Sequence, residues 1–253
     1  MRPLAATSFM KHNSVVPDAS SKLSKKEQVA DMFNNIAAKY DLLNHLLSLG
    51  IDKGWRTKAI KSIEGIQPKK ILDVATGTGD LAIAAAKKFP DSKIIGIDIA
   101  AQMLEVGKVK ISDKALENRI EMIVGDSEAL PYDSGHFDAV LCAYGVRNFQ
   151  NLNNGLSEMF RVTKAGGRIA ILEFSQPKKF PVKQVFSFYF KFILPLFGKI
   201  VSRHNTAYNY LPESVMAFPE GEDFCTILKN CGFKNVNAQP LSFGITSLYT
   251  GEK

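Results

Sequence analysis

Residues 69–80 read KKILDVATGTGD, and this stretch decides the fold class of the chain. Its apolar run, Ile71–Val74, predicts a short buried strand, and LAIAAAKKF at 81–89 predicts a helix. The glycines between them, Gly77 and Gly79, permit a tight turn and let a ligand approach the backbone closely. The helix that follows offers free N–H groups and the positive end of its dipole. The segment therefore predicts a ligand-binding turn.

Apolar runs continue to alternate with helical segments beyond this turn. Four more runs have the length of buried strands: 92–100, 119–126, 137–145 and 167–175. Such alternation is typical of βαβ units, in which helices cover both faces of a mostly parallel sheet. Two last runs, 233–241 and 244–252, have no helix between them and predict a terminal hairpin. We therefore predict an α/β, doubly wound, Rossmann-like sheet.

The glycine turn alone leaves its ligand open. Gly77-x-Gly79-x-x-Ala82 fits the fingerprint of dinucleotide-binding domains, and Asp98 follows nineteen residues after Gly79. The same residues suit S-adenosylmethionine, whose methionine part would lie on the turn. A purely structural glycine turn is the third interpretation.

Polar residues end the second and third predicted strands. A carboxylate at Asp98 can accept hydrogen bonds from both ribose hydroxyls of a nucleoside, or it can cap the helix that starts near Ala101. Asp126 can bind an adenine amino group and the backbone of Ser127 can contact the ring, although both residue types also favour turns.

Six longer strings carry a resemblance to a known family. They are FNNIAAKYDLLNHLLSLGIDKGWR (33–56), DVATGTGDL (73–81), SEALPYDSGHFD (127–138), YGVRN (144–148), LEFSQP (172–177) and YLPESVMAFP (210–219). With these strings in order, the chain resembles the C-methyltransferases of menaquinone and ubiquinone biosynthesis from about residue 29 to its end. The resemblance implies a seven-stranded class I methyltransferase core whose last strand is antiparallel. It implies S-adenosylmethionine as methyl donor and a polyprenylated quinol ring as acceptor, demethylmenaquinol or the benzoquinol of the ubiquinone pathway.

The resemblance also assigns cofactor contacts. It places Thr78, beside Gly77 and Gly79, at the methionine part, Asp98 at the ribose, and Asp126 and Ser127 at the adenine. Ala143 stands where some members have serine, so a side-chain hydrogen bond is missing there.

Carbon methylation needs an electron-rich ring, so the protein must help to remove a phenolic proton or stabilise the phenolate. Arg147 is the leading candidate to hold that oxygen or polarise a water, since a guanidinium stays protonated; a structural ion pair is the alternative. Asn148 either orients the same oxygen or caps a helix. Asp41 and His45 share a helical face, and His45 titrates near neutrality; a solvent-facing pair is the alternative.

Other polar residues near the predicted acceptor site are less specific. Tyr208, Tyr210 and Glu213 precede or open a helix and are candidates to line a quinol pocket, although Glu213 equally suits a helix cap. Glu173, at the end of the fifth predicted strand, either faces the site or is structural.

An aromatic stretch, residues 185–197, is flanked or interrupted by the basic residues Lys178, Lys179, Lys183, Lys191, Lys199 and Arg203. Pro195 and Lys191 make it too short to span a membrane, so it suits attachment to a membrane surface or a core helix under a cap. The net charge of +7 does not choose between a membrane, nucleic acid and neither. No basic motif with stacking aromatics predicts nucleic-acid binding.

Three scattered cysteines have no metal-ligand spacing, so we expect free thiols, no metal and a reducing compartment. No secretory signal or transmembrane helix is expected. We expect a cytoplasmic protein at the inner face of the cell membrane, and a homodimer is compatible with the sequence.

We predict a mobile arm over 1–23 and one domain over 24–253, with a helical lid at 24–66 and a helical insertion at 178–219. Competing functions are a nicotinamide oxidoreductase, a methyltransferase for another lipid or small molecule, and a non-catalytic cofactor-binding subunit.

Overall fold

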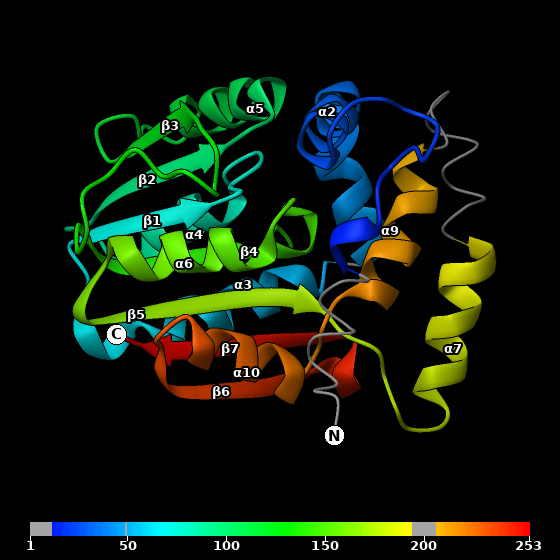
Figure 1. Cartoon of the computed structure of the whole chain (residues 1–253). Coiled ribbons are helices and arrows are strands. Elements are labelled where there is room, and N and C mark those ends of the chain that lie inside the picture. Colours follow the sequence, from blue (N-terminus) through cyan, green and yellow to red (C-terminus); the bar gives the residue numbers. More distant parts are fainter. Residues whose placement is uncertain (1–11, 49, 194–205) are drawn as a thin grey trace.

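A computed structural model describes residues 12–48, 50–193 and 206–253 (Figure 1). Seven strands form one sheet of order β3-β2-β1-β4-β5-β7-β6, in which β7 runs antiparallel to both neighbours. The strands are β1 (Lys70–Val74), β2 (Lys93–Asp98), β3 (Ile120–Val124), β4 (Phe137–Ala143), β5 (Thr163–Phe174), β6 (Lys234–Leu241) and β7 (Thr246–Glu252). The predicted doubly wound α/β fold and terminal hairpin are confirmed.

Helices connect the strands and cover the sheet. They are α2 (Lys25–Ser48), α3 (Asp52–Ser62), η1 (Glu64–Ile66), α4 (Asp80–Lys88), α5 (Ala101–Ser112), η2 (Val146–Asn148), α6 (Leu152–Val162), α7 (Val182–Phe188), η3 (Tyr189–Ile193), α9 (Thr206–Ala217), α10 (Glu222–Asn230) and η4 (Ser242–Gly244). Among the described residues, none of these helices is long and apolar enough to cross a membrane.

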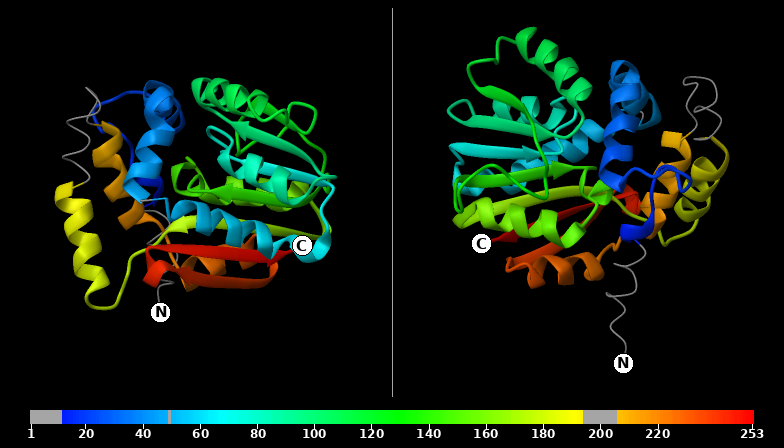
Figure 2. Two further views of the ribbon diagram at one scale, coloured as in Figure 1. Left: turned by 180° about the vertical axis from the view of Figure 1, so that it is seen from behind. Right: turned by 45° about the horizontal axis from the view of Figure 1, so that its top comes forward.

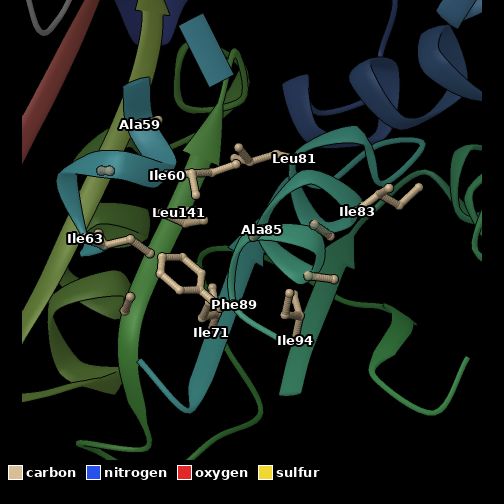
Figure 3. Packing of buried hydrophobic residues seen from close by; sticks show 14 of the residues in the cluster. Ala59, Ile60, Ile63, Ile71, Leu81, Ile83, Ala85, Phe89, Ile94 and Leu141 are labelled. Carbon is tan, nitrogen blue, oxygen red and sulfur yellow. The ribbon is translucent and has the colours of Figure 1, made fainter. Parts of the chain in front are cut away.

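Two apolar layers lie on opposite faces of the sheet, because neighbouring residues of a strand point to opposite sides. Ile71 of β1 packs with α3, α4 and α5, whereas the next residue, Leu72, packs with α6 and α10. Figure 3 shows the first layer, where Phe89 and Ile60 meet residues of the strands. Both faces are therefore buried, which explains the nearly continuous apolar runs in the sequence.

Beyond the carboxyl ends of the parallel strands lie α2, α9 and α7 (Figures 1 and 2). We predicted that the whole of 24–66 forms a lid, but of this segment α3 packs on the sheet through Trp55, Ala59 and Ile60. Their apolar side chains complete the layer beside α4, so within residues 24–66 it is α2 that lies over the strand ends.

Residues 12–23 lie within the predicted arm, and the structure buries His12 at their start against the domain, while about half of the segment is exposed. His12 is 1% exposed, and its Nε2 lies 2.8 Å from the backbone oxygen of Arg147. Lys25, at the start of α2, is also buried, and its Nζ donates to the same oxygen at 3.4 Å. These two residues anchor the chain behind η2.

Candidate active site

Two pockets meet at the carboxyl edge of the sheet, beneath α2. The smaller, strand-end pocket is lined by residues of α2 and by residues at or just after the ends of β1, β2, β3 and β4, among them Lys26, Gly77, Asp98, Asp126, Ser127 and Ala143. The larger, apolar pocket is lined mainly by α2, α7, η3 and α9. Phe33, Tyr40, Tyr144 and Asn148 line both pockets, so a group held in one is adjacent to a group held in the other.

The glycine turn forms the floor of the strand-end pocket. Gly77 and Gly79 have φ angles of 57° and 77°, a region that glycine adopts without strain. A side chain at Gly77 would begin 3.3 Å from the Cε of Met103, so that site is also tightly enclosed. Gly77 lines the pocket, while Gly79 lies just before the first turn of α4. The predicted ligand-binding turn thus has one glycine at the pocket and one at the helix entrance.

Asp98 lies at the end of β2 and lines the same pocket. Its Oδ2 accepts a hydrogen bond from the Gly77 N–H at 2.8 Å, and its Oδ1 accepts one from the Ala100 N–H at 2.9 Å. Burial raises the pKa of this carboxyl, while the two N–H groups oppose the rise. The carboxylate therefore fixes the turn and the entrance to α5 and still presents oxygen lone pairs to the pocket.

The adenine end predicted from the sequence lies after β3. Asp126 and Ser127 both line the strand-end pocket. Asp126 forms an ion pair with Lys26 of α2 and accepts a hydrogen bond from the Glu128 N–H at 2.9 Å. Ala143, at the end of β4, lines the pocket without a side-chain hydrogen-bonding group. The sequence did not predict that Lys26 belongs to this site, because its partner, Asp126, is one hundred residues away.

Thr78 and Asp41 contact each other and are not among the residues that line either pocket. The Thr78 hydroxyl donates to Oδ1 of Asp41 at 2.5 Å, and Lys110 donates to Oδ2 at 2.6 Å. Lys110 also pairs with Asp80 at the start of α4. These contacts hold α2 to the core and favour a structural role for Asp41. The side chain of His45 lies outside the part of the chain whose side chains the structure describes.

Arg147 lies in η2, directly after β4, and lines the apolar pocket. It is 7% exposed, and its Nη1 donates to Oε1 of the fully buried Glu173 at 2.9 Å and to the Tyr144 backbone oxygen at 2.5 Å. Burial disfavours the charged form of Arg147, but the Glu173 carboxylate, with smaller effects of Tyr40 and Tyr210, more than offsets this, and the pKa lies above its usual value. The ion pair that we held as the alternative is present, and the guanidinium is a fixed cation rather than a base.

Three buried polar atoms around the apolar pocket have no hydrogen-bond partner among the described residues: Arg147 Nε, Asn148 Oδ1 and Tyr210 Oη. Buried polar groups in native proteins are nearly always paired with protein, water or ligand. Tyr210, which the sequence offered as a residue of the quinol pocket, lines the apolar pocket from α9. It lies more than sixty residues from η2 in sequence, so its convergence with Arg147 and Asn148 depends on the tertiary fold. The pocket therefore offers two unpaired donors and two unpaired acceptors inside a mostly apolar wall.

Comparisons with known proteins agree on one family. The ubiE/COQ5 methyltransferase family matches residues 21–253. Over 90% of its length, the chain is 46% identical to a demethylmenaquinone methyltransferase of Bacteroides fragilis, covering 94% of that protein. It is 44% identical to a ubiquinone/menaquinone biosynthesis C-methyltransferase of Geobacter sulfurreducens, with 90% of each chain covered. Among solved structures, a putative S-adenosylmethionine-dependent methyltransferase of Methanococcus maripaludis has the same fold, with a TM-score of 0.58, 20% identity, and 93% and 96% of the two chains covered.

Proposed function

Because the chain belongs to the ubiE/COQ5 methyltransferase family, we propose that it methylates a ring carbon of a polyprenylated quinol, converting demethylmenaquinol to menaquinol. Family membership confirms the sequence prediction of an S-adenosylmethionine-dependent methyltransferase and excludes the nicotinamide oxidoreductase. The observation that carries the proposed acceptor is the meeting of a small strand-end pocket with a large apolar one at four shared residues. That arrangement suits a nucleoside cofactor facing a prenylated ring.

The strand-end pocket fits S-adenosylmethionine, which supplies an electrophilic methyl group on a sulfonium. Asp98 has lone pairs for the ribose hydroxyls, and Asp126 can accept a hydrogen bond from the adenine amino group once Lys26 shares or releases it. Gly77 provides the bare backbone for the methionine part. The Thr78 side chain is already bonded to Asp41, so its backbone is the part available to the cofactor.

The quinol ring belongs at the junction of the two pockets, where Tyr40, Tyr144 and Asn148 line both. Arg147 Nε–H would donate a hydrogen bond to a ring oxygen, and Asn148 Oδ1 would accept a hydrogen bond from the neutral hydroxyl. A fixed cation beside that oxygen lowers the cost of ionisation, and ionisation moves electron density onto the ring. Holding both reactants in line contributes further, because proximity replaces a bimolecular encounter.

The prenyl tail fits the outer part of the apolar pocket, where α7 and η3 form a wall. Val182, Phe186, Tyr189 and Phe190 line that wall. The helices α7 and η3 and the residues just before them also expose four apolar side chains, with exposed lysines between and before them: Phe180, Val185, Phe188 and Phe192, and Lys178, Lys179, Lys183 and Lys191. Apolar anchors beside basic residues suit an anionic lipid surface.

The α7 surface would thus pass the tail from the membrane into the pocket without extracting the whole lipid into water. The inner face of the cell membrane is the surface we propose, since the three cysteines are free thiols.

Sedimentation with vesicles of phosphatidylglycerol tests whether the protein binds an anionic lipid surface, with phosphatidylcholine vesicles in parallel. Binding of the anionic vesicles should be lost in a Phe188→Ser/Phe192→Ser double variant. Equal binding by that variant would remove the membrane part of the proposal.

The acceptor is tested by incubating the protein with methyl-labelled S-adenosylmethionine and short-tailed demethylmenaquinol, followed by mass spectrometry of the quinone fraction. We expect one methyl group on the ring carbon. The oxidised demethylmenaquinone is the control and should stay unmodified, because its ring carbon is not nucleophilic. The demethylated benzoquinol of the ubiquinone pathway is assayed beside it, since related proteins carry both activities in their names. Cofactor binding without transfer to either quinol would refute the proposed acceptor.

A further inference from the structure

One of the three unpartnered atoms, the Tyr210 hydroxyl, has no place yet in the proposed chemistry. Tyr210 lies in α9 and is 3% exposed. Its ring packs against Val29 and Met32 of α2, and its hydroxyl finds no hydrogen-bond partner among the described residues. The side chain lines the apolar pocket together with Arg147 and Asn148. Arg147 and Tyr210 are close enough to influence each other electrostatically.

A phenylalanine would fill the same space against α2 without burying an unpaired hydroxyl. Such a hydroxyl is unfavourable in a protein interior unless something bonds it. Its neighbours in the pocket are a donor and an acceptor that are also unpaired. The simplest partner for all three is a ligand oxygen placed between them.

We infer that Tyr210 donates a hydrogen bond to the quinol oxygen next to the methylated carbon, the same oxygen that Arg147 Nε–H holds. This inference rests on the proposed function. In a 1,4-quinol, ionisation of one oxygen enriches the carbon beside it, whereas the other oxygen is meta to that carbon. The oxygen held by two donors must therefore be the adjacent one.

The step balances as follows. The phenolic proton goes to solvent, and the electron pair of the quinolate moves through the ring to the adjacent carbon, which forms the new C–C bond. The methyl–sulfur bond breaks, and its electrons stay on sulfur. The ring carbon then loses its proton to solvent and the ring becomes aromatic again. Tyr210 acts throughout as a donor rather than a base, because burial raises the pKa of its hydroxyl and keeps it protonated.

Tyr210→Phe removes this hydroxyl and leaves the ring. A lost hydrogen bond to a charged group predicts a kcat lower by about 10- to 100-fold. The affinity for S-adenosylmethionine, measured by calorimetry, should not change. The rising limb of the kcat–pH profile should move to higher pH, since the quinolate loses a stabilising donor. Tyr132→Phe is the control, because Tyr132 lies in neither pocket and packs on Phe137.

Thermal denaturation separates this role from a structural one. Removing an unpaired buried hydroxyl should leave the melting temperature unchanged or raise it. A lower melting temperature would show that the hydroxyl has a structural partner, and it would overturn the inference. A kcat within about twofold of wild type with an unmoved pH profile would overturn it as well. Either of these two outcomes overturns only the role of Tyr210 as long as the wild-type protein methylates the quinol. If the wild-type protein does not methylate the quinol, the proposed function itself is refuted.

A second measurement does not depend on turnover by the variant. A ring-halogenated naphthol that is ionised at neutral pH serves as the quinolate probe, and its methyl ether serves as the neutral comparison. Wild type should bind the ionised probe more tightly than the ether, and Tyr210→Phe should lose most of that preference. An equal preference in both proteins would contradict the inference.

Discussion

Neutralising Glu173, the buried partner of Arg147, should destabilise the protein by an amount that can be estimated from the structure. Glu173 is completely buried, and its carboxylate accepts hydrogen bonds from Arg147 Nη1 at 2.9 Å, from the Arg147 N–H at 3.3 Å and from the Phe174 N–H at 2.9 Å. Glu173→Gln keeps the shape and one accepting oxygen but leaves the Arg147 charge uncompensated. Breaking a buried pair by neutralising one partner costs about 3–5 kcal/mol.

We take the lower end, about 3 kcal/mol, because glutamine can still accept one of these hydrogen bonds. For a domain of this size, a destabilisation of 1 kcal/mol lowers the melting temperature by roughly 2–4 °C, so the variant should melt about 6–12 °C below wild type. Differential scanning calorimetry measures this directly. A drop of less than about 2 °C would refute the view that this pair holds the site together.

The matched control is Glu252→Gln. Glu252 on β7 pairs with Arg168 on β5 at 2.8 Å, so the same two residue types meet at a similar distance, and one partner of each pair lies on β5. Both side chains are about one third exposed, at 34% and 35%, and an exposed pair contributes at most about 1 kcal/mol.

The folded fraction of Glu173→Gln should also show the rising limb of its kcat–pH profile at a lower pH than wild type. Its quinol oxygen would face an unbalanced positive charge, the reverse of the shift expected for Tyr210→Phe.

Three further substitutions test the rest of the site. Arg147→Ala should lower kcat by about 100- to 1000-fold with the S-adenosylmethionine Kd nearly unchanged, and near-normal turnover would remove its assigned role. Asp98→Asn should weaken S-adenosylmethionine binding by roughly 10- to 100-fold in calorimetry while kcat at saturation stays close to wild type; an unchanged Kd would contradict the ribose contact. Burial, with a smaller effect of Lys25, lowers the pKa of His12 to about 4, below its unfolded value of 6.5. The contribution of the neutral His12 to the free energy of unfolding is therefore fully present above pH 6.5 and is lost as the pH drops toward 4. The free energy of unfolding, measured by chemical denaturation, should fall by about 3 kcal/mol over this pH range in wild type and should not show this fall in His12→Gln. Parallel plots of the free energy of unfolding against pH for the two proteins would refute this prediction.

The cofactor half of the site was predictable because its signals are local. Gly77 lies in a continuous strand–turn–helix segment, and Asp98 and Asp126 end neighbouring parallel strands, so strand order alone brings them to one edge. The family strings supplied Arg147 and Asn148, and the structure places both beside the shared wall. The catalytic role predicted for Asp41 finds no support in this geometry, because the carboxylate is committed to Thr78 and Lys110.

The acceptor half depends on contacts that sequence patterns do not carry. Tyr210 reaches the pocket from a helix after the last parallel strand, and its importance lies in an unpaired hydroxyl that only packing reveals. His12 lay in a segment whose composition predicted mobility, yet its ring is buried against Phe218 and bonded to the backbone of Arg147. Apolar helices such as α7 also gave an ambiguous pattern, since one helix can line a pocket and face outward at the same time.

Helix α2 joins the two halves of the site, because its residues line both pockets. Near its start, Lys26 binds Asp126 of the strand-end pocket, and farther along Asp41 binds Thr78 and Lys110 of the core. Between these attachments, Phe33 and Tyr40 form part of the wall of both pockets. The same helix therefore forms part of the pocket proposed for the cofactor and part of the pocket proposed for the quinol. It holds the two pockets side by side, as the transfer of a methyl group between two separately bound substrates requires.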